Sequence, residues 1–197
     1  MSNLLVRRTE RPDSNVTVFT FHGTGGDENQ FHGFAEQLYP AAKIVSPRGN
    51  VSEGGMARYF RRTSEGVYDM DDLSFRVRVM AEFVQAETAA AEQTIGIGYS
   101  NGANIMAAVT FLYPNAFDAM ILMHPLIPWG PEPQPGLKGK NVLITAGRND
   151  PICPQARTSA LADYYEGQGA NVRTVWHEGG HEIAEIEVSA IRDFAGR

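Results

Sequence analysis

The chain has 197 residues, enough to bury a core, and its composition is that of a globular protein, with 43% hydrophobic and 20% charged residues. A formal net charge of −6 argues against nucleic acid or an anionic membrane as a partner, and a single cysteine excludes an intramolecular disulfide. Because no long apolar run follows Arg7 and Arg8 and no segment approaches membrane-spanning length, we expect a cytoplasmic protein without stable membrane insertion.

Short apolar runs alternate with helical patterns along the chain. The runs show little polar alternation, which is typical of parallel strands buried on both faces of a sheet. In chain order, the expected strands are Val16–Phe21, Lys43–Ser46, Thr94–Gly98, Ala119–Met123, Asn141–Ala146 and Asn171–Trp176.

Helical patterns lie between and after these runs. The first helix is expected to begin at Asp27, which has capping-box spacing to Gln30. Later helices are expected where apolar residues recur three or four positions apart, the next of them starting near Asp71 and Asp72. The recurring residues are Leu73, Val77, Met80 and Val84, then Ile105, Val109 and Leu112, and finally Ile183, Ile186, Ala190 and Phe194.

This alternation predicts the fold class. We expect a single α/β domain over residues 1–197, with a mostly parallel sheet covered by helices on both faces. In such a sheet the active site gathers at the carboxyl ends of the strands. Two irregular stretches, Pro47–Asp69 and His124–Gly139, leave strand carboxyl ends, and the second holds five of the eleven prolines. Each is expected either to wall a pocket or to serve as a plain connector.

The run Gly98-Tyr99-Ser100-Asn101-Gly102 matches the G-x-S-x-G pattern, in which a serine projects from a sharp turn between a strand and a helix. The two glycines keep side chains away from the strained backbone of the serine. An apolar strand is expected before Ser100 and an amphipathic helix after it. We therefore interpret Ser100 as a nucleophile rather than as part of a glycine-rich structural turn.

A serine nucleophile needs a general base, and the base needs an orienting carboxylate. In this type of fold the acid and then the histidine follow later strands of the sheet. Asp150 lies in the turn after the strand at 141–146. His177 directly follows the strand at 171–176, and His181 lies beyond the two glycines Gly179 and Gly180. We predict Asp150 as the orienting acid and His181 as the base, with His177 as the competing base.

Backbone N–H groups are expected to stabilise the oxyanion that forms when a serine attacks a carbonyl. One belongs to Asn101, the residue after the nucleophile. The second is expected in His22-Gly23-Thr24-Gly25-Gly26, where glycines let the backbone approach a substrate, and we choose Thr24. A phosphate-binding loop is the rival interpretation, but the fingerprint G-x-G-x-x-G is not met.

The run His177-Glu178-Gly179-Gly180-His181 also matches H-E-x-x-H, the zinc-protease signature. That motif binds zinc only on a helix, where its two histidines share one face. Two adjacent glycines, each about 1 kcal/mol less favourable than alanine in a helix, argue against one here. We therefore expect no metal site, and a metalloprotease stays an alternative.

Six motifs occur together over nearly the whole chain. They are His22-Gly23-Thr24-Gly25-Gly26, Ser46-Pro47-Arg48-Gly49-Asn50, Arg61-Arg62 with Glu65-Gly66, Gly98-Tyr99-Ser100-Asn101-Gly102, Asn149-Asp150-Pro151-Ile152, and Gly180-His181. In this combination the chain resembles the small carboxylesterase/phospholipase branch of the α/β-hydrolases, related to dienelactone hydrolases and acyl-protein thioesterases. The resemblance implies an α/β-hydrolase fold without a large lid domain, the triad and oxyanion donors given above, short-chain ester substrates and often a homodimer.

Residues on loops that leave the strand carboxyl ends are candidates for a substrate pocket, with burial in the core as the alternative. They are Met56, Tyr59, Phe60, Trp129 and Ile152. Three arginines in the same region, Arg58, Arg61 and Arg62, are expected to form ion pairs, with recognition of a substrate carboxylate as the alternative.

The remaining cysteine and histidines carry weaker signals. Cys153 is expected to be a small buried hydrophobe. His22 and His32 are expected to be structural, and His124 lies near a strand end with no motif around it.

We therefore expect a serine hydrolase that cleaves small carboxylic esters through an acyl-enzyme on Ser100, without a metal or organic cofactor. Hydrolysis of a thioester, a lysophospholipid or a dienelactone-type lactone on the same triad is the nearest alternative. From a different class, a non-catalytic binding protein with the same fold stays open, although the complete Ser, Asp and His set argues against it.

Overall fold

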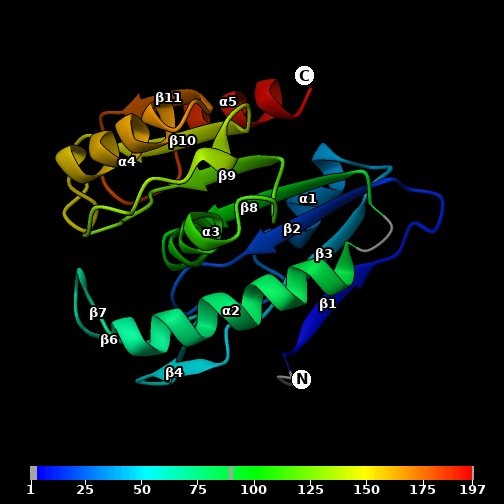
Figure 1. Cartoon of the computed structure of the whole chain (residues 1–197), viewed down its shortest axis with the longest axis horizontal. Coiled ribbons are helices and arrows are strands. Elements are labelled where there is room, and N and C mark those ends of the chain that lie inside the picture. Colours follow the sequence, from blue (N-terminus) through cyan, green and yellow to red (C-terminus); the bar gives the residue numbers. More distant parts are fainter. Residues whose placement is uncertain (1–3, 89–90, 197) are drawn as a thin grey trace.

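A seven-stranded sheet with the strand order β1-β3-β2-β8-β9-β10-β11 lies at the centre of the computed structural model, which describes residues 4–88 and 91–196 (Figure 1). β1 is antiparallel to β3, and the other neighbouring strands of this sheet are parallel. The strands are β1 (Val6–Thr9), β2 (Val16–Phe21), β3 (Lys43–Pro47), β8 (Gln93–Tyr99), β9 (Ala119–Met123), β10 (Asn141–Gly147) and β11 (Asn171–His177).

The six predicted strands are confirmed to within one residue at each end. Their side chains are mostly buried, as expected of strands covered on both faces. The prediction omits β1, because this edge strand is short and partly exposed and its centre is Arg7-Arg8 rather than an apolar run.

Helices cover both faces of the sheet, as predicted (Figure 1). α2 (Met70–Glu87), α3 (Asn101–Leu112) and α4 (Gln155–Gly167) contribute to the hydrophobic cluster on one face. α1 (His32–Leu38) and α5 (Glu185–Ala195) contribute to the cluster on the other face. None of the helices in residues 4–88 and 91–196 combines the length and the apolar character needed to cross a bilayer.

One predicted helix start is wrong. α1 begins at His32 and not at Asp27, because Asp27 forms a turn in which its carboxylate accepts the N–H of Asn29. The Gln30 side chain does not complete a capping box but accepts the N–H of Gly23. The predicted start of α2 is confirmed to within one residue, because the carboxylate of Asp69 caps it and Asp71 and Asp72 lie in its first turn.

Two apolar positions of the predicted helical faces are exposed. Leu112 is the last residue of α3, and Ile186 lies in the first turn of α5; they are 60% and 53% exposed. Ile183 precedes α5. The periodicity therefore identifies the helices correctly but assigns the wrong side to residues near their ends.

The stretch Pro47–Asp69 is not irregular but forms two short hairpins, each with two antiparallel strands. These are β4 (Val51–Glu53) with β5 (Met56–Arg58), and β6 (Arg62–Ser64) with β7 (Val67–Tyr68). The stretch His124–Gly139 contains only a short 3₁₀ helix, Pro135–Leu137. Because both stretches follow strand carboxyl ends, they stand beside the turn that carries Ser100.

Candidate active site

Ser100 lies at the turn between β8 and α3, with φ 51° and ψ −116°. A positive φ is strained for a residue with a side chain, and such strain is concentrated at functional sites. A Cβ on Gly102 would overlap the carbonyl oxygen of Phe21, and a Cβ on Gly98 would lie 2.8 Å from the nitrogen of Ala103. The two glycines of the motif therefore allow the close approach of strand and helix that this turn requires.

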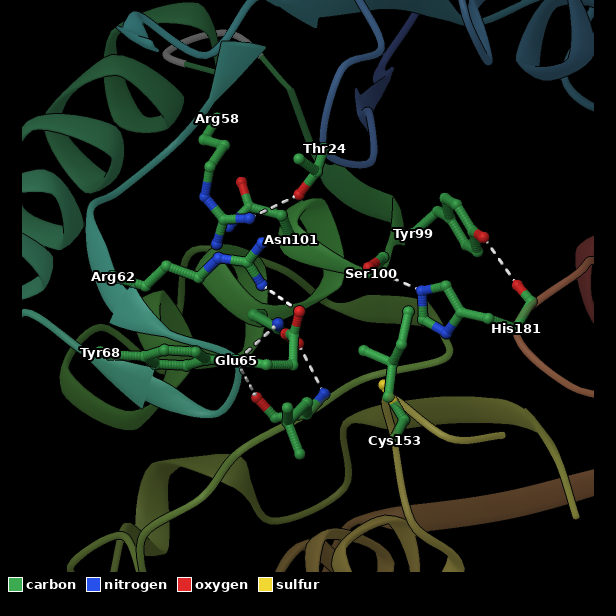
Figure 2. Close-up of a pocket in the computed structure, with 13 residues that line it drawn as sticks. Thr24, Arg58, Arg62, Glu65, Tyr68, Tyr99, Ser100, Asn101, Cys153 and His181 are labelled. Carbon is green, nitrogen blue, oxygen red and sulfur yellow. Dashed lines mark hydrogen bonds and ion pairs between the residues drawn. The ribbon is translucent and has the colours of Figure 1, made fainter. Parts of the chain in front are cut away.

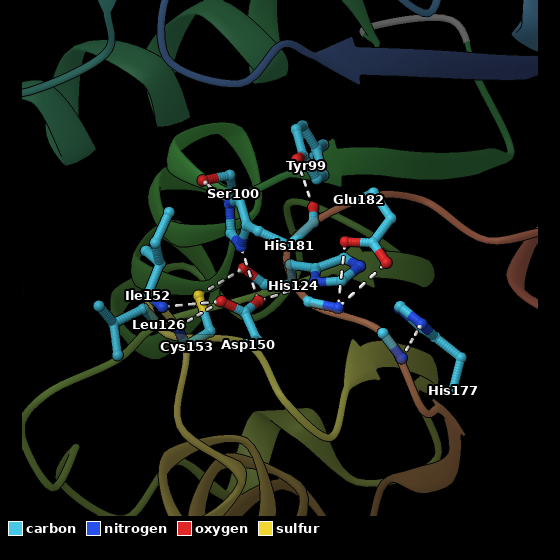
Figure 3. A network of polar contacts seen from close by, with 12 residues as sticks. Tyr99, Ser100, His124, Leu126, Asp150, Ile152, Cys153, His177, His181 and Glu182 are labelled. Atoms are coloured by element: carbon cyan, nitrogen blue, oxygen red, sulfur yellow. Dashed lines mark hydrogen bonds and ion pairs between the residues drawn. The ribbon is translucent and has the colours of Figure 1, made fainter.

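His181 contacts both Ser100 and Asp150. Its Nε2 lies 2.9 Å from Ser100 Oγ, and its Nδ1 lies 2.7 Å from Asp150 Oδ2 (Figure 3). The loop after β11 reaches this position by passing over the end of β10, where a Cβ on Gly147 would overlap the carbonyl oxygen of Gly180. The structure thus brings together the three predicted residues from the ends of β8, β10 and β11.

Asp150 is buried, and both of its oxygens accept hydrogen bonds. Oδ1 accepts the N–H groups of Ile152 and Cys153 at 2.8 and 3.0 Å, and Oδ2 faces the rings of His124 and His181. Burial alone would raise the pKa of Asp150, but these hydrogen bonds outweigh burial and hold the pKa below its ordinary value. Since an ionised carboxylate can only accept, His181 carries its proton on Nδ1 and its Nε2 is free to accept one.

His177, the competing base, points elsewhere. Its Nδ1 accepts the N–H of Gly179 at 3.0 Å, and its Nε2 lies 3.2 Å from the buried carboxylate of Glu187. The H-E-x-x-H run also lacks the helix that the zinc signature requires, because β11 ends at His177 and α5 begins only at Glu185. This geometry does not fit a zinc-protease site.

The predicted oxyanion donors, Thr24 and Asn101, line the same cavity as Ser100. Thr24 Oγ1 accepts a hydrogen bond from Arg58 Nη1 at 2.6 Å, and Asn101 Oδ1 accepts the N–H of Tyr59 at 2.8 Å. Among the residues that the structure describes, neither the N–H of Thr24 nor that of Asn101 donates a hydrogen bond. Both N–H groups thus lack a hydrogen-bond acceptor within the described part of the chain.

A cavity of about 260 Å³ opens beside Ser100 (Figure 2). Its walls combine aromatic, aliphatic and charged side chains from both irregular stretches and from the strand ends. The lining residues are Thr24, Arg58, Arg62, Glu65, Tyr68, Tyr99, Ser100, Asn101, Asn104, Leu126, Ile152, Cys153 and His181.

Of the five pocket candidates, only Ile152 lines this cavity. Met56 is 45% exposed, because it lies at the turn of the first hairpin. Tyr59 and Phe60 are buried in the core, where Tyr59 fixes neighbouring backbone groups. Trp129 packs against the edge of the core on the α3 side. The predictions for these four residues are wrong because the two stretches that carry them turn their large side chains into the core or away from Ser100.

The three arginines form ion pairs, as expected. Arg58 and Arg62 both lie 3.0 Å from carboxylate oxygens of Glu53, and Arg62 also contacts Glu65. We call Glu53, Arg58, Arg62 and Glu65 the outer charge cluster. Arg61 pairs instead with aspartates at the start of α2. Arg58 and Arg62 also line the cavity, which the sequence pattern does not indicate.

The cavity walls also include Tyr68, Asn104 and Leu126, which were not among the pocket candidates. They form one hydrogen-bonded group, in which Asn104 Nδ2 donates to Tyr68 Oη and Asn104 Oδ1 accepts the N–H of Leu126. Asn104 follows Ser100 by one helical turn, and that spacing is the signal that places it on the same side of α3.

Cys153 is buried, as expected, and its thiol contacts the carbonyl oxygen of His124 at 3.2 Å. Burial raises the pKa of this thiol, so it stays neutral although it lines the cavity. His22 and His32 are also buried, and each contacts a backbone or hydroxyl group of a neighbouring segment. Their structural role agrees with the prediction.

Sequence reasoning missed the role of His124. Its Nδ1 lies 2.9 Å from Asp150 Oδ2, the same oxygen that faces His181, and its Nε2 lies 3.1 Å from Glu187 Oε1 (Figure 3). We call His124, Asp150, His177 and Glu187 the inner charge cluster. The signal was available in part, because His124 directly follows β9, and β9 lies between β8 and β10.

Known proteins of similar sequence and structure include hydrolases. No family model matches the chain. The Bacillus subtilis protein "Putative hydrolase MhqD" is 36% identical over 190 residues, which cover 94% of each chain. The carboxylesterase of Bacillus cereus has a solved structure that is 37% identical, with a TM-score of 0.91 over 99% of this chain and 94% of that one. The structure of the protein Atu2452 of unknown function, from Agrobacterium tumefaciens, is 49% identical, with a TM-score of 0.90 over 96% and 94%.

The hydrolase of Bacillus subtilis and the carboxylesterase of Bacillus cereus each match nearly the whole chain at more than a third identity. Hydrolysis of esters agrees with a serine turn at the end of a parallel sheet. The chain therefore belongs to the carboxylesterase branch of the α/β-hydrolases and is a carboxylesterase-type hydrolase.

Proposed function

We propose that this protein hydrolyses small carboxylic esters through an acyl-enzyme on Ser100. The observation that carries the proposal is the continuous chain of contacts from Ser100 Oγ through His181 to Asp150 Oδ2, at 2.9 and 2.7 Å. A serine, a histidine and an ionised carboxylate in this order form the arrangement that activates a hydroxyl group for attack on a carbonyl.

In the first half of the reaction, Ser100 Oγ forms a bond to the ester carbonyl carbon while its proton passes to His181 Nε2. The negative charge on the carbonyl oxygen is stabilised by the N–H groups of Thr24 and Asn101. Collapse of this intermediate breaks the bond to the alcohol, which leaves with the proton from His181. Asp150 stabilises the imidazolium form of His181 and stays ionised throughout.

In the second half, His181 removes a proton from water, and the resulting hydroxide attacks the acyl-enzyme carbonyl. Collapse releases the carboxylic acid and returns the proton to Ser100. The protein groups that these steps use are the side chains of Ser100, His181 and Asp150 and the two backbone N–H groups.

The size of the cavity supports a short acyl group. About 260 Å³ lined by Leu126, Ile152 and Tyr68 has room for a few carbon atoms next to Ser100. We expect acetyl and butyryl esters to be turned over faster than decanoyl esters.

The test is steady-state hydrolysis of p-nitrophenyl acetate, butyrate and decanoate by wild type and by Ser100→Ala. The change should lower kcat by at least about 10⁴-fold without altering the circular dichroism spectrum. Ser74→Ala, at an exposed position of α2, is the matched control and should retain full activity. Full activity in Ser100→Ala would contradict the proposal.

A further inference from the structure

His124 occupies a buried position between two carboxylates, one of which belongs to the proposed triad. The side chains of His124, Asp150 and Glu187 are 0% exposed. Two buried carboxylates without a cation between them would be strongly unfavourable. His124 is the side chain that contacts both.

The two carboxylates favour a positive charge on this imidazole. Nδ1 donates to Asp150 Oδ2 at 2.9 Å, and Nε2 lies 3.1 Å from Glu187 Oε1 in an ion pair that lacks hydrogen-bond alignment. An ionised carboxylate can only accept, so Nδ1 carries a proton, and a second proton on Nε2 gives the cation that both buried carboxylates attract. Burial alone would lower the pKa of His124, but its contacts with Glu187 and Asp150 outweigh burial and raise the pKa above its ordinary value.

The backbone at His124 is held as firmly as its ring. Its φ of 49° makes it, with Ser100, one of two non-glycine residues with positive φ among those that the structure describes. Its N–H donates to the carbonyl oxygen of Thr145 at 2.7 Å, and its carbonyl oxygen accepts from the thiol of Cys153. Strain of this kind persists only where the surroundings impose it.

The titratable groups around His124 come from every segment packed against it. They are Tyr99 at the end of β8, Asp150 and Cys153 after β10, His177, His181 and Glu182 at and after the end of β11, and Glu187 on α5. Burial raises the pKa of Tyr99 to about 12, so its hydroxyl is neutral, and the thiol of Cys153 is neutral for the same reason. Glu182 lies at the surface.

His177 is neutral by its contacts. Its Nδ1 accepts the N–H of Gly179, which leaves the proton on Nε2, against Glu187 Oε2. With neutral His181, Asp150 and Glu187 each carry a negative charge and His124 carries a positive charge, so one negative charge is left over. When His181 receives the proton of Ser100, the net charge of these groups becomes zero.

We propose that His124 is a positioning residue for the esterase reaction: as a buried imidazolium between Asp150 and Glu187, it fixes the Asp150 carboxylate and offsets part of its charge toward His181. The inference rests on the proposed role of Ser100, Asp150 and His181.

The consequence is a pH range for activity. The ring centroids of His124 and His181 lie 5.1 Å apart, so a positive charge on His124 disfavours a second one on His181. Without the charge on His124 this repulsion is lost, and the acidic limb of the activity profile should move upward.

The test is the pH dependence of kcat/KM for p-nitrophenyl acetate in His124→Asn. Asparagine tolerates positive φ, and its amide can still donate to Asp150, so the variant removes the charge with little change of shape. We expect the acidic limb to move up by about one to two pH units, as one unit charge at this separation would do in a medium of intermediate dielectric constant. His177→Gln is the matched control, because His177 contacts Glu187 but not Asp150, and its acidic limb should stay in place.

A second variant and a spectroscopic measurement cover the case in which His124→Asn does not fold. In Glu187→Gln the imidazole loses its second carboxylate, so His124 should become neutral near pH 7 and the acidic limb should rise in the same direction. Nitrogen-15 NMR of histidine-labelled wild type should show one buried imidazolium that keeps two protonated nitrogens to a higher pH than an ordinary histidine does.

Each outcome decides between the two proposals. The positioning role alone would be overturned if folded, active His124→Asn kept the acidic limb of the kcat/KM profile in place. A neutral His124 in the wild-type spectrum below pH 7 would also overturn it. Wild type without esterase activity would overturn the proposed function and this inference with it. The positioning role is supported if the acidic limb of the kcat/KM profile moves upward in His124→Asn and stays in place in His177→Gln.

Discussion

Two charge clusters flank Ser100, and they differ in their contact with solvent. In the inner charge cluster the side chains of His124, Asp150 and Glu187 are 0% exposed. In the outer charge cluster Arg58 and Arg62 are only 3% and 16% exposed, but their partners Glu53 and Glu65 are 39% and 48% exposed. The inner cluster joins the ends of three strands to α5, whereas the outer one joins the two hairpins.

This difference in exposure to solvent determines how strongly each charge cluster affects stability and the reaction. A buried charge keeps its full effect on neighbouring groups, and removing its partner leaves it uncompensated. A half-exposed pair is screened by water and salt and contributes little to stability. We therefore expect removal of a charge from the inner cluster, at His124, Asp150 or Glu187, to alter the reaction and the fold. Changes in the outer cluster should alter mainly substrate binding.

The largest effect is expected from Asp150→Asn. The amide keeps the shape but no longer holds His181 in the tautomer that accepts a proton, so kcat/KM should fall by about 10⁴-fold. Asp163→Asn, on the exposed side of α4, is the matched control and should be unaffected. A loss of less than tenfold in folded Asp150→Asn would contradict the role of this carboxylate.

The next test compares the stability of the two clusters directly. Glu187→Ala leaves His124 without one of its two buried counter-charges and should lower the free energy of unfolding by about 3–5 kcal/mol. Glu65→Ala removes a half-exposed partner of Arg62 and should change it by less than about 1 kcal/mol. Urea denaturation measures the free energy of unfolding of both variants. Equal losses of this free energy would contradict the distinction between the two clusters.

The inner cluster also predicts how stability depends on pH. The carboxyl pKa values of Asp150 and Glu187 lie below their ordinary values of 3.8 and 4.5, despite burial. Their contribution is present above those values and is lost as the pH falls below them. The pKa of His124 lies above its ordinary value of 6.5, so its contribution is present below pH 6.5 and is lost as the pH rises through the shifted value.

Wild type should therefore be most stable between about pH 5 and pH 6.5, with urea midpoints that fall on both sides. In His124→Asn the decline on the alkaline side should be weaker, because this variant has no imidazolium to lose. An identical alkaline decline in both proteins would show that another group causes it.

The smallest effect is expected from Arg62→Gln. Arg62 lines the cavity and contacts Glu53 and Glu65, so its loss should change KM by less than about tenfold and leave kcat unchanged. The change in KM should shrink further in high salt. A large fall in kcat would mean that the outer cluster takes part in the reaction itself.

The fold was largely predictable because its signals are local. Parallel strands buried on both faces appear as apolar runs, and β2 and β9 were predicted with their observed ends. The serine turn was predictable for the same reason, since Gly98, Ser100 and Gly102 are neighbours in the chain. Chain order then gave Asp150 and His181, which the structure brings into contact with each other.

The features that were missed depend on contacts between distant segments. His124 and Glu187 are far apart in the sequence and meet only because β9 lies beside β10 while α5 packs over β10 and β11. The pocket walls depend on how the hairpins fold, which turns Tyr59 and Phe60 into the core and Tyr68 toward the cavity. No local spacing in the sequence encodes these arrangements.

The central claim is that Ser100 is an activated nucleophile, and covalent labelling with a small fluorophosphonate tests it most directly. Intact mass and peptide mapping of the labelled wild type should show a single adduct, on Ser100, that is absent in Ser100→Ala. Labelling should be slower by orders of magnitude in Asp150→Asn. A folded wild type that forms no adduct, or one that is labelled elsewhere, would contradict the account.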